Sequence, residues 1–213
     1  MPEHRIFAAI YDRLLAGAEK GGLREMRADL IREARGRTLE LGAGTGHNLD
    51  HYPAAVGELV LTEPDPFMAA RLRKHLAAEP PAPPNVEVVE APAEQLPFDD
   101  ASFDTVVATL IFCTVEDPER AIAQARRVLR PEGRLLYLEH VRSADSPRLA
   151  RWQDRVERPW GWFAGGCHPN RPTDETLPAA GFEVEQLNRG TFPKSGVTPW
   201  VRPLISGSAR PAP

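Results

Sequence analysis

The chain has 213 residues, of which 42% are hydrophobic and 26% are charged. This length suits one α/β domain with a sizeable core and leaves little room for a second domain. A formal net charge of −4 gives no basic footprint, which disfavours nucleic acid as a partner. The sequence has no apolar run of about 18 residues, so it predicts no membrane-spanning helix. We expect a cytoplasmic protein, either a monomer or a homodimer.

The first part of the chain predicts two helices and then an alternation of strands and helices. The helices fall within residues 1–36 and are separated at Gly21 and Gly22. Apolar runs predict strands at Thr38–Leu41, Glu58–Thr62, Val86–Glu90, Asp104–Phe112 and Arg134–Glu139, the last one after a turn at Pro131–Gly133. Amphipathic spacing predicts helices at Pro66–Ala78 and Asp117–Leu129, the second with Asp117 as its N-cap. This rhythm favours a parallel sheet covered by helices on both faces.

The pattern loosens after the fifth predicted strand. Residues 142–172 hold three of the four tryptophans with many prolines and glycines, and we interpret this segment as a cap over an acceptor pocket. Aromatic residues that only pack this segment onto the sheet are the alternative. A short helix at Thr173–Ala180 and strands at Phe182–Leu187 and Arg202–Ser208 complete the chain. We expect residues 1–213 to form a single domain.

The most informative motif is the glycine-rich run Leu39–Gly46, which closes the first strand and is expected to open a helix. Glycine is needed where the backbone turns tightly and a ligand lies against it. A dinucleotide fingerprint would place its third glycine at position 47, which is His47, so an NAD-dependent oxidoreductase is disfavoured. The spacing here is GxGxG with Glu40 before it, which suits the cationic S-adenosylmethionine (SAM). A glycine turn without a ligand is the alternative.

A second acid follows the second predicted strand. Glu63 lies roughly 20 residues past the glycine loop, where a carboxylate can accept hydrogen bonds from both hydroxyls of a ribose. Asp65, two residues further on, is the competing candidate. We favour Glu63 for the ribose.

These motifs together resemble those of the class I SAM-dependent methyltransferases. Leu96-Pro97-Phe98, Phe103–Val107 and Arg127–Gly133 are similar to three further motifs of that family. The resemblance implies a Rossmann-like α/β fold with a seven-stranded, mostly parallel sheet whose last strand is antiparallel, and SAM as the methyl donor. We expect SAM to contact Glu40, Gly42, Ala43, Gly44, Thr45, Gly46, Glu63, Pro64, Ala93, Glu94, Thr109 and Tyr11. For Tyr11, core packing is the alternative.

One branch of that family looks most similar. The runs GTGHNLDHYP, TLIFCTVED and YLEHV, with Gly166-Cys167, resemble the alkyl-thiol S-methyltransferases, also called methyltransferase-like seven. Pro92 departs from this pattern because many relatives have an Asp there that contacts adenine, so the backbone of Ala93 and Glu94 would have to serve. Glu63 departs as well, since the thiol branch usually has Asp at that position.

The expected reaction is a direct displacement at the methyl carbon, in which positioning supplies much of the rate. A thiol is already partly ionised at neutral pH and requires little of the protein, whereas a carbon acid needs a base. His140, at the end of the fifth predicted strand, is the best candidate base. A purely structural histidine is the alternative.

The acceptor pocket is expected to follow the fourth strand and to include the cap. Its candidate residues are Phe112, Trp152, Trp160, Cys167 and His168. Cys167 and His168 are too few for a metal site, so no metal is expected. We therefore predict a small-molecule methyltransferase that favours a thiol. The alternatives are C- or O-methylation of a quinol or phenol, and a SAM or nucleoside sensor without activity.

Overall fold

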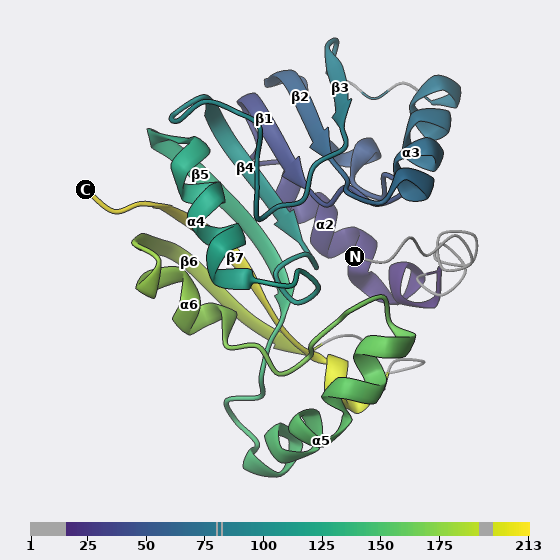
Figure 1. Ribbon diagram of the computed structural model, residues 1–213, viewed down its shortest axis with the longest axis vertical. Helices are drawn as coiled ribbons and strands as arrows, with labels where there is room; N and C mark the ends of the chain where they lie inside the picture. Colours follow the sequence, from purple (N-terminus) through teal and green to yellow (C-terminus); the bar gives the residue numbers. More distant parts are fainter. Residues whose placement is uncertain (1–15, 80, 82, 192–197) are drawn as a thin grey trace.

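The computed structural model describes residues 16–79, 81, 83–191 and 198–213. A seven-stranded sheet runs through the centre of the molecule (Figure 1). Its strand order is β3-β2-β1-β4-β5-β7-β6. The strands are β1 Gly36–Leu41, β2 Val56–Thr62, β3 Val86–Val89, β4 Phe103–Thr109, β5 Leu129–His140, β6 Phe182–Thr191 and β7 Pro203–Pro211.

Strands β1 to β5 pair in parallel, and β7 is antiparallel to both β5 and β6. This arrangement confirms the predicted Rossmann-like sheet with an antiparallel last strand. The carboxyl ends of the five parallel strands therefore lie at one edge of the sheet, where ligands bind in such folds.

The helices cover both faces of the sheet, as expected. The described helical elements are η1 Glu19–Leu23, α2 Arg24–Ile31, η2 Leu49–His51, α3 Pro66–Ala78, α4 Pro118–Val128, α5 Pro147–Phe163, α6 Thr173–Ala179 and η3 Pro199–Val201. Buried residues of α4 and α6 join one apolar core cluster, and those of α2 and α3 join the other. Within the described residues, no helix is long and apolar enough to cross a bilayer.

Helices α3 and α4 both begin at a capping aspartate and a proline. The side chain of Asp65 accepts hydrogen bonds from the backbone N–H groups of Phe67 and Met68, which caps α3. Asp117 accepts a hydrogen bond from the N–H of Arg120 and caps α4, as predicted. Both helices have proline in their first turn, where its missing N–H costs no hydrogen bond.

The structure corrects three local expectations. The strand predicted to reach Phe112 ends at Thr109, because Leu110 adopts a positive φ of 57° and turns the chain. The segment Pro131–Gly133 lies inside the bounds of β5, although the pairing register passes from Leu129 directly to Arg134. The glycine loop opens no α-helix: it continues through turns into the three-residue η2.

The cap segment, residues 142–172, contains a 17-residue helix that the sequence did not predict. Ser146 caps the start of α5 through a hydrogen bond from the N–H of Leu149. Pro159 lies inside the helix, and its presence in the sequence argued against a continuous helix. Figure 1 shows α5 at the end of the molecule away from β3. That residues 142–172 cover an acceptor pocket, and that the chain is one domain, stay predictions.

Candidate functional site

The glycine loop follows β1 at the carboxyl edge of the sheet. Gly42, Gly44 and Gly46 have φ values of 60°, 60° and 95°, a region that favours glycine. A Cβ on Gly42 would lie 2.3 Å from the side chain of Ile111. The N–H of Ala43 donates to the carbonyl of Thr62 at 2.8 Å, so the loop is attached to the end of β2. The loop therefore has a fixed shape that side chains would disturb.

Glu63 lies directly against this loop. Its Oε2 accepts a hydrogen bond of 2.8 Å from the N–H of Gly44, and its Oε1 accepts one of 2.9 Å from the N–H of Asp65. Burial raises the pKa of Glu63, while these two backbone hydrogen bonds act in the opposite direction. The competing acid, Asp65, caps α3 instead. Of the two acids, Glu63 is the one in contact with the glycine loop.

A cavity of about 220 Å³ opens beside Gly42 of the loop and Pro64, the residue that follows Glu63. Its lining brings together four residues that the sequence predicted as cofactor contacts, Gly42, Pro64, Ala93 and Glu94. The remaining lining residues are Pro92, Ile111, Val115 and Glu116. The last three were missed, because they belong to the turn after β4 that the sequence analysis assigned partly to a strand.

Glu40 lies at the centre of a buried polar network. Its two carboxylate oxygens accept hydrogen bonds from Nδ2 of Asn48 at 2.9 Å and from the hydroxyl of Tyr52 at 2.6 Å. Burial raises the pKa of Glu40 to about 7, although these hydrogen bonds and the positive charge of Arg27 lower it. The carboxyl group can therefore change its charge near neutral pH.

The same network holds Thr109 at the end of β4. The hydroxyl oxygen of Thr109 accepts hydrogen bonds of 2.9 Å from both Arg27 and Asn48. Arg27 also pairs with Glu19 at 3.1 Å. Arg27, Asn48 and Tyr52 were not among the site residues predicted from the sequence. The last two follow the glycine loop closely and were open to detection, but Arg27 lies on a separate helix with no local motif.

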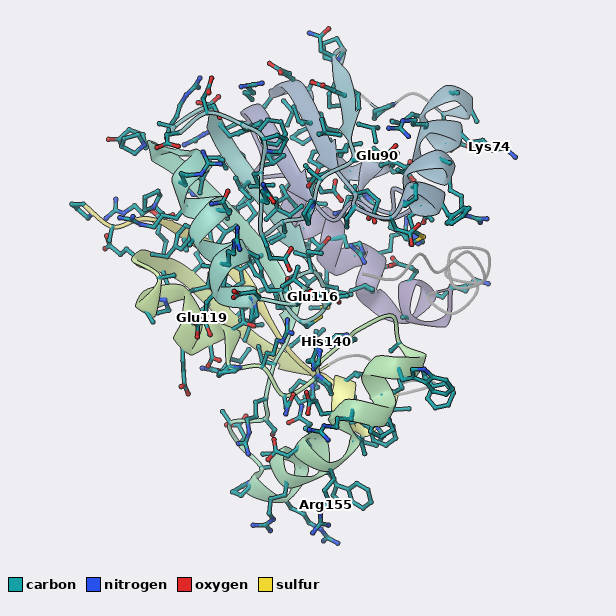
Figure 2. All side chains as sticks on the ribbon, in the orientation of Figure 1. Lys74, Glu90, Glu116, Glu119, His140 and Arg155 are labelled. Carbon is teal, nitrogen blue, oxygen red and sulfur yellow. The ribbon has the colours of Figure 1, made fainter. Side chains whose placement is uncertain are left out.

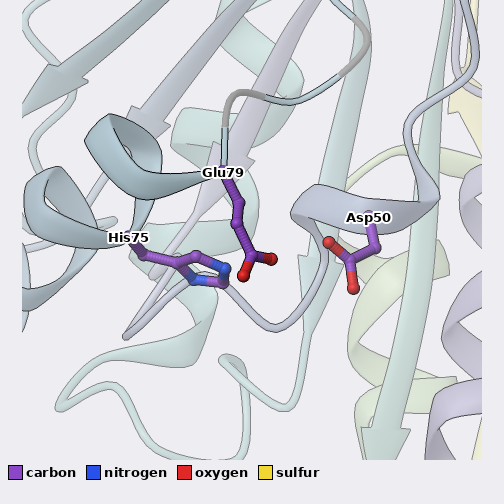
Figure 3. A group of neighbouring side chains, drawn as sticks. All are labelled: Asp50, His75 and Glu79. Carbon is purple, nitrogen blue, oxygen red and sulfur yellow. The ribbon is translucent and has the colours of Figure 1, made fainter.

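The loop also contacts α3 through Thr45, whose carbonyl oxygen lies 3.1 Å from Nδ1 of His75. Figure 3 shows the side chains of His75, Glu79 and Asp50 converging, with one possible metal-binding atom from each within 4.8 Å of the others. The sequence analysis missed this group. Asp50 already pairs with Arg24 at 3.2 Å. The expectation that the chain holds no metal stays a prediction. Tyr11, predicted to contact SAM, lies outside the described residues.

Glu139, on β5, organises the turn after β4. Its fully buried carboxylate accepts hydrogen bonds from the N–H groups of Ile111, Phe112 and Cys113 at 3.0–3.1 Å. Burial and the nearby Cys113 raise the pKa of Glu139 well above its ordinary range. The sequence analysis missed Glu139, although it stands inside the run YLEHV.

His140, the candidate base, ends β5 where the α5 region meets the sheet (Figure 2). Its ring atom Nδ1 is buried. Burial lowers the pKa of His140 to about 4, despite a hydrogen bond with the backbone of Val201 that raises it. The imidazole is therefore neutral near pH 7 and accepts a proton only weakly.

The structure brings some of the predicted acceptor residues together. The neighbouring thiol of buried Cys113 lowers the pKa of buried Cys167. The backbone N–H of His168 donates to the carbonyl of Cys113 at 2.6 Å, which joins the cap to the turn after β4.

The side chains of the remaining predicted acceptor residues make other contacts. Nδ1 of His168 is 2.7 Å from a carboxylate oxygen of Glu157 on α5. Trp152 is half exposed on α5, and the side chain of Phe112 is fully buried in an apolar core cluster. That these residues line an acceptor pocket stays a prediction.

Known proteins resemble the chain in sequence. Residues 39–137 match a family described as a methyltransferase domain. Thiol S-methyltransferase TMT1B of Rattus norvegicus is 32% identical over 149 residues, which cover 70% of this chain and 61% of the rat protein. Thiol S-methyltransferase TMT1A of Homo sapiens is 30% identical over 205 residues, which cover 95% of this chain and 82% of the human protein. The match thus spans less than two thirds of the rat protein's length.

A solved structure shares the fold. It is a SAM-dependent methyltransferase from Thermotoga maritima, described as a possible histamine N-methyltransferase. Its TM-score is 0.69 at 22% identity, and the match covers 97% of this chain and 96% of that one.

Strand order, glycine loop and relatives define one class of protein: the chain belongs to the class I SAM-dependent methyltransferases. Within that class it is close to the branch that contains TMT1A and TMT1B. The family resemblance predicted from the sequence is therefore confirmed.

Proposed function

We propose that the chain transfers the methyl group of SAM to a small thiol. The observation that carries the cofactor part is the contact of Glu63 with Gly44 beside the cavity of about 220 Å³. A carboxylate with free lone pairs at this position suits the two ribose hydroxyls. The cavity next to it, bordered by Pro92 and Ala93, suits the adenine. SAM, when bound, supplies a methyl group activated by its positively charged sulfur.

Glu40 supports a cationic ligand in the same site. Its carboxylate is buried beside the loop. The nearby positive charge of Arg27 favours the ionised form of this carboxylate. Asn48 and Tyr52 hold the carboxylate in place, so its orientation does not depend on the ligand. We infer that Glu40 favours a cationic ligand through its ionised form, which the positive charge of the bound ligand would stabilise, and that it is not a proton carrier in the reaction.

The low basicity of the candidate base, His140, supports a thiol acceptor. A histidine whose pKa is about 4 removes a proton poorly from an alcohol, a phenol or a carbon acid. A thiol supplies its own thiolate at neutral pH. The rat and human relatives are both named as thiol S-methyltransferases. Trp160 on α5 and Cys113 in the turn after β4 would then contribute apolar surface to the acceptor side.

The test is a two-stage assay on the full chain. Calorimetry with S-adenosylhomocysteine measures cofactor binding without turnover, and we expect saturable binding that Glu63→Ala weakens. Radiolabelled SAM is then offered with alkyl thiols, quinols, phenols and amines in parallel, and we expect label on the thiols. Activity on a quinol or phenol alone would reject the thiol, and binding without turnover on any acceptor would favour a sensor.

A further inference from the structure

The outer face of α5 carries a row of basic side chains. Arg148, Arg151, Arg155 and Arg158 recur every three or four residues, so they lie along one face of the helix, and all four are exposed. Helix α5 lies at the end of the molecule away from β3 (Figure 1), and Arg155 lies on its outer side (Figure 2). We call this row, together with the exposed Trp152, Trp162 and Phe163, the α5 outer face.

Aromatic side chains accompany the arginines. Trp152, Trp162 and Phe163 are 50%, 81% and 69% exposed. The rings of Trp162 and Phe163 pack edge to face with their centroids 4.8 Å apart. Trp152 and Phe163 are eleven residues apart, which is three helical turns, so they lie on the same side of α5. The α5 outer face thus combines cationic groups with large exposed apolar groups, and such a patch marks an interaction surface.

The acids on α5 do not neutralise these four arginines. In the part of the chain that the structure describes, no ion pair involves any of them. The two acids of α5 pair with other residues: Asp154 with Arg142 at 2.8 Å, and Glu157 with His168 at 2.7 Å. Four positive charges therefore face outward on a chain whose net charge is −4.

The opposite side of α5 is held firmly by a buried amide. Nε2 of Gln153, which is fully buried, donates to the carbonyls of Val141 and Pro169 at 3.0 and 2.8 Å. Its Oε1 accepts a hydrogen bond from the N–H of Ser143 at 2.8 Å. These bonds fix the rotation of the helix about its axis, so the basic and aromatic side chains cannot turn inward without breaking them.

We propose that the α5 outer face docks on the surface of a bilayer that contains anionic phospholipids. An amphipathic helix of this kind lies in the plane of the interface, with arginines at the lipid phosphates and aromatic rings at the boundary of the acyl chains. The exposed Trp162 and Phe163 favour a bilayer over RNA, because the acyl boundary removes their apolar surface from water. The docking requires neither SAM nor an acceptor, so it stands or fails separately from the proposed function.

The first experiment is sedimentation of the full chain with vesicles. We expect binding to vesicles of phosphatidylcholine mixed equally with phosphatidylserine, little binding to phosphatidylcholine alone, and weaker binding as salt rises. Removing one basic residue near such a surface weakens binding by about fivefold, so R151Q/R155Q is expected to weaken it by about 25-fold. The control R32Q/R210Q removes the same charge from exposed positions elsewhere and is expected to leave binding unchanged.

The second pair of variants tests the aromatic part. W162A/F163A is expected to weaken vesicle binding several-fold, whereas L187A, at another exposed apolar residue, is expected to have no effect. Circular dichroism confirms that each variant is folded. Equal binding to both kinds of vesicle, or equal loss in α5 and control variants, would overturn the proposal. So would tighter binding to single-stranded RNA, or a dimer that W162A/F163A dissociates while vesicle binding is unchanged.

Discussion

The carboxylate of Glu63 accepts a 2.8 Å hydrogen bond from the backbone N–H of Gly44, and so joins the end of β2 to the glycine loop after β1. The two residues are 19 positions apart in sequence. This contact holds the loop in shape, and Pro64, the residue after Glu63, lines the cavity beside the loop.

Glu63→Ala is expected to weaken SAM binding by about 1.5–3 kcal/mol, the scale of hydrogen bonds that involve a charged group. Asp65→Ala removes the N-cap of α3 and is expected to lower the free energy of unfolding by about 1 kcal/mol with little change in affinity. Calorimetry with S-adenosylhomocysteine and urea unfolding measure the two effects. If Asp65→Ala reduces affinity and Glu63→Ala does not, the assignment of the ribose-binding acid is wrong.

Gly42→Ala is expected to lower the free energy of unfolding by about 1–2 kcal/mol, because a side chain is strained at a φ of 60°. The new Cβ would also lie 2.3 Å from Ile111, which lines the cavity, so SAM affinity is expected to fall as well. Gly57→Ala is the matched control, since a Cβ there meets nothing within 4 Å. Urea unfolding curves for Gly42→Ala that overlay those of the parent would contradict the prediction.

The buried Glu40 predicts a pH dependence of stability. Because its pKa is about 7 in the folded chain against an ordinary value of 4.5, the folded state holds the proton more tightly than the unfolded state. Its contribution to stability is therefore present below pH 4.5 and is lost as the pH rises through 7. The loss is on the order of 2–4 kcal/mol.

Urea unfolding at several pH values, compared between the parent and Glu40→Gln, measures this contribution. Glu63 and Glu139 also have raised pKa values, so only the difference between the two proteins reports on Glu40. We expect the curve of Glu40→Gln to be flatter between pH 5 and pH 8. Parallel curves would show that Glu40 has the same pKa in the folded and unfolded states.

Local signals explain the elements that the sequence predicted well. Helix α3 has the predicted bounds Pro66–Ala78, because Asp65 caps it and Pro66 suits its first position. Helix α5 was missed because Pro159 and Gly161 resemble breakers in the sequence. Its support comes from the contacts of Gln153 with distant segments, and local patterns do not report those contacts.

Some residues of the site can likewise be predicted from local sequence motifs, whereas others depend on contacts between distant residues. The cavity residues Gly42 and Glu94 belong to motifs that are recognisable in the sequence. The hydrogen bond between Arg27 and Thr109 joins residues 82 positions apart, and no spacing in the sequence predicts it. Burial sets the pKa values of Glu40 and His140, and a side chain's burial is known only once the sheet and helices are packed.

The pH dependence of methyl transfer is expected to follow the acceptor and not His140. His140 has a pKa of about 4 and is neutral throughout the range above about pH 5, so its titration leaves no step in a rate profile there. If the acceptor is a thiol, the rate is expected to rise with pH through the pKa of the thiol itself, since the thiolate is the nucleophile. Thiols of different pKa, assayed with saturating SAM, are expected to shift the profile by the difference in their pKa values.

The variant His140→Gln tests whether this histidine acts as a general base in the reaction. Turnover on thiols is expected to fall by less than the ~10²–10⁴-fold loss of an essential general base, and the shape of the pH profile is expected to be unchanged. Calorimetry with S-adenosylhomocysteine confirms that the variant still binds the cofactor. A larger loss in a variant that binds normally would show that His140 transfers a proton during the reaction. Because a thiolate requires no such transfer, that result would move the acceptor toward a phenol, a hydroxyl group or a carbon acid.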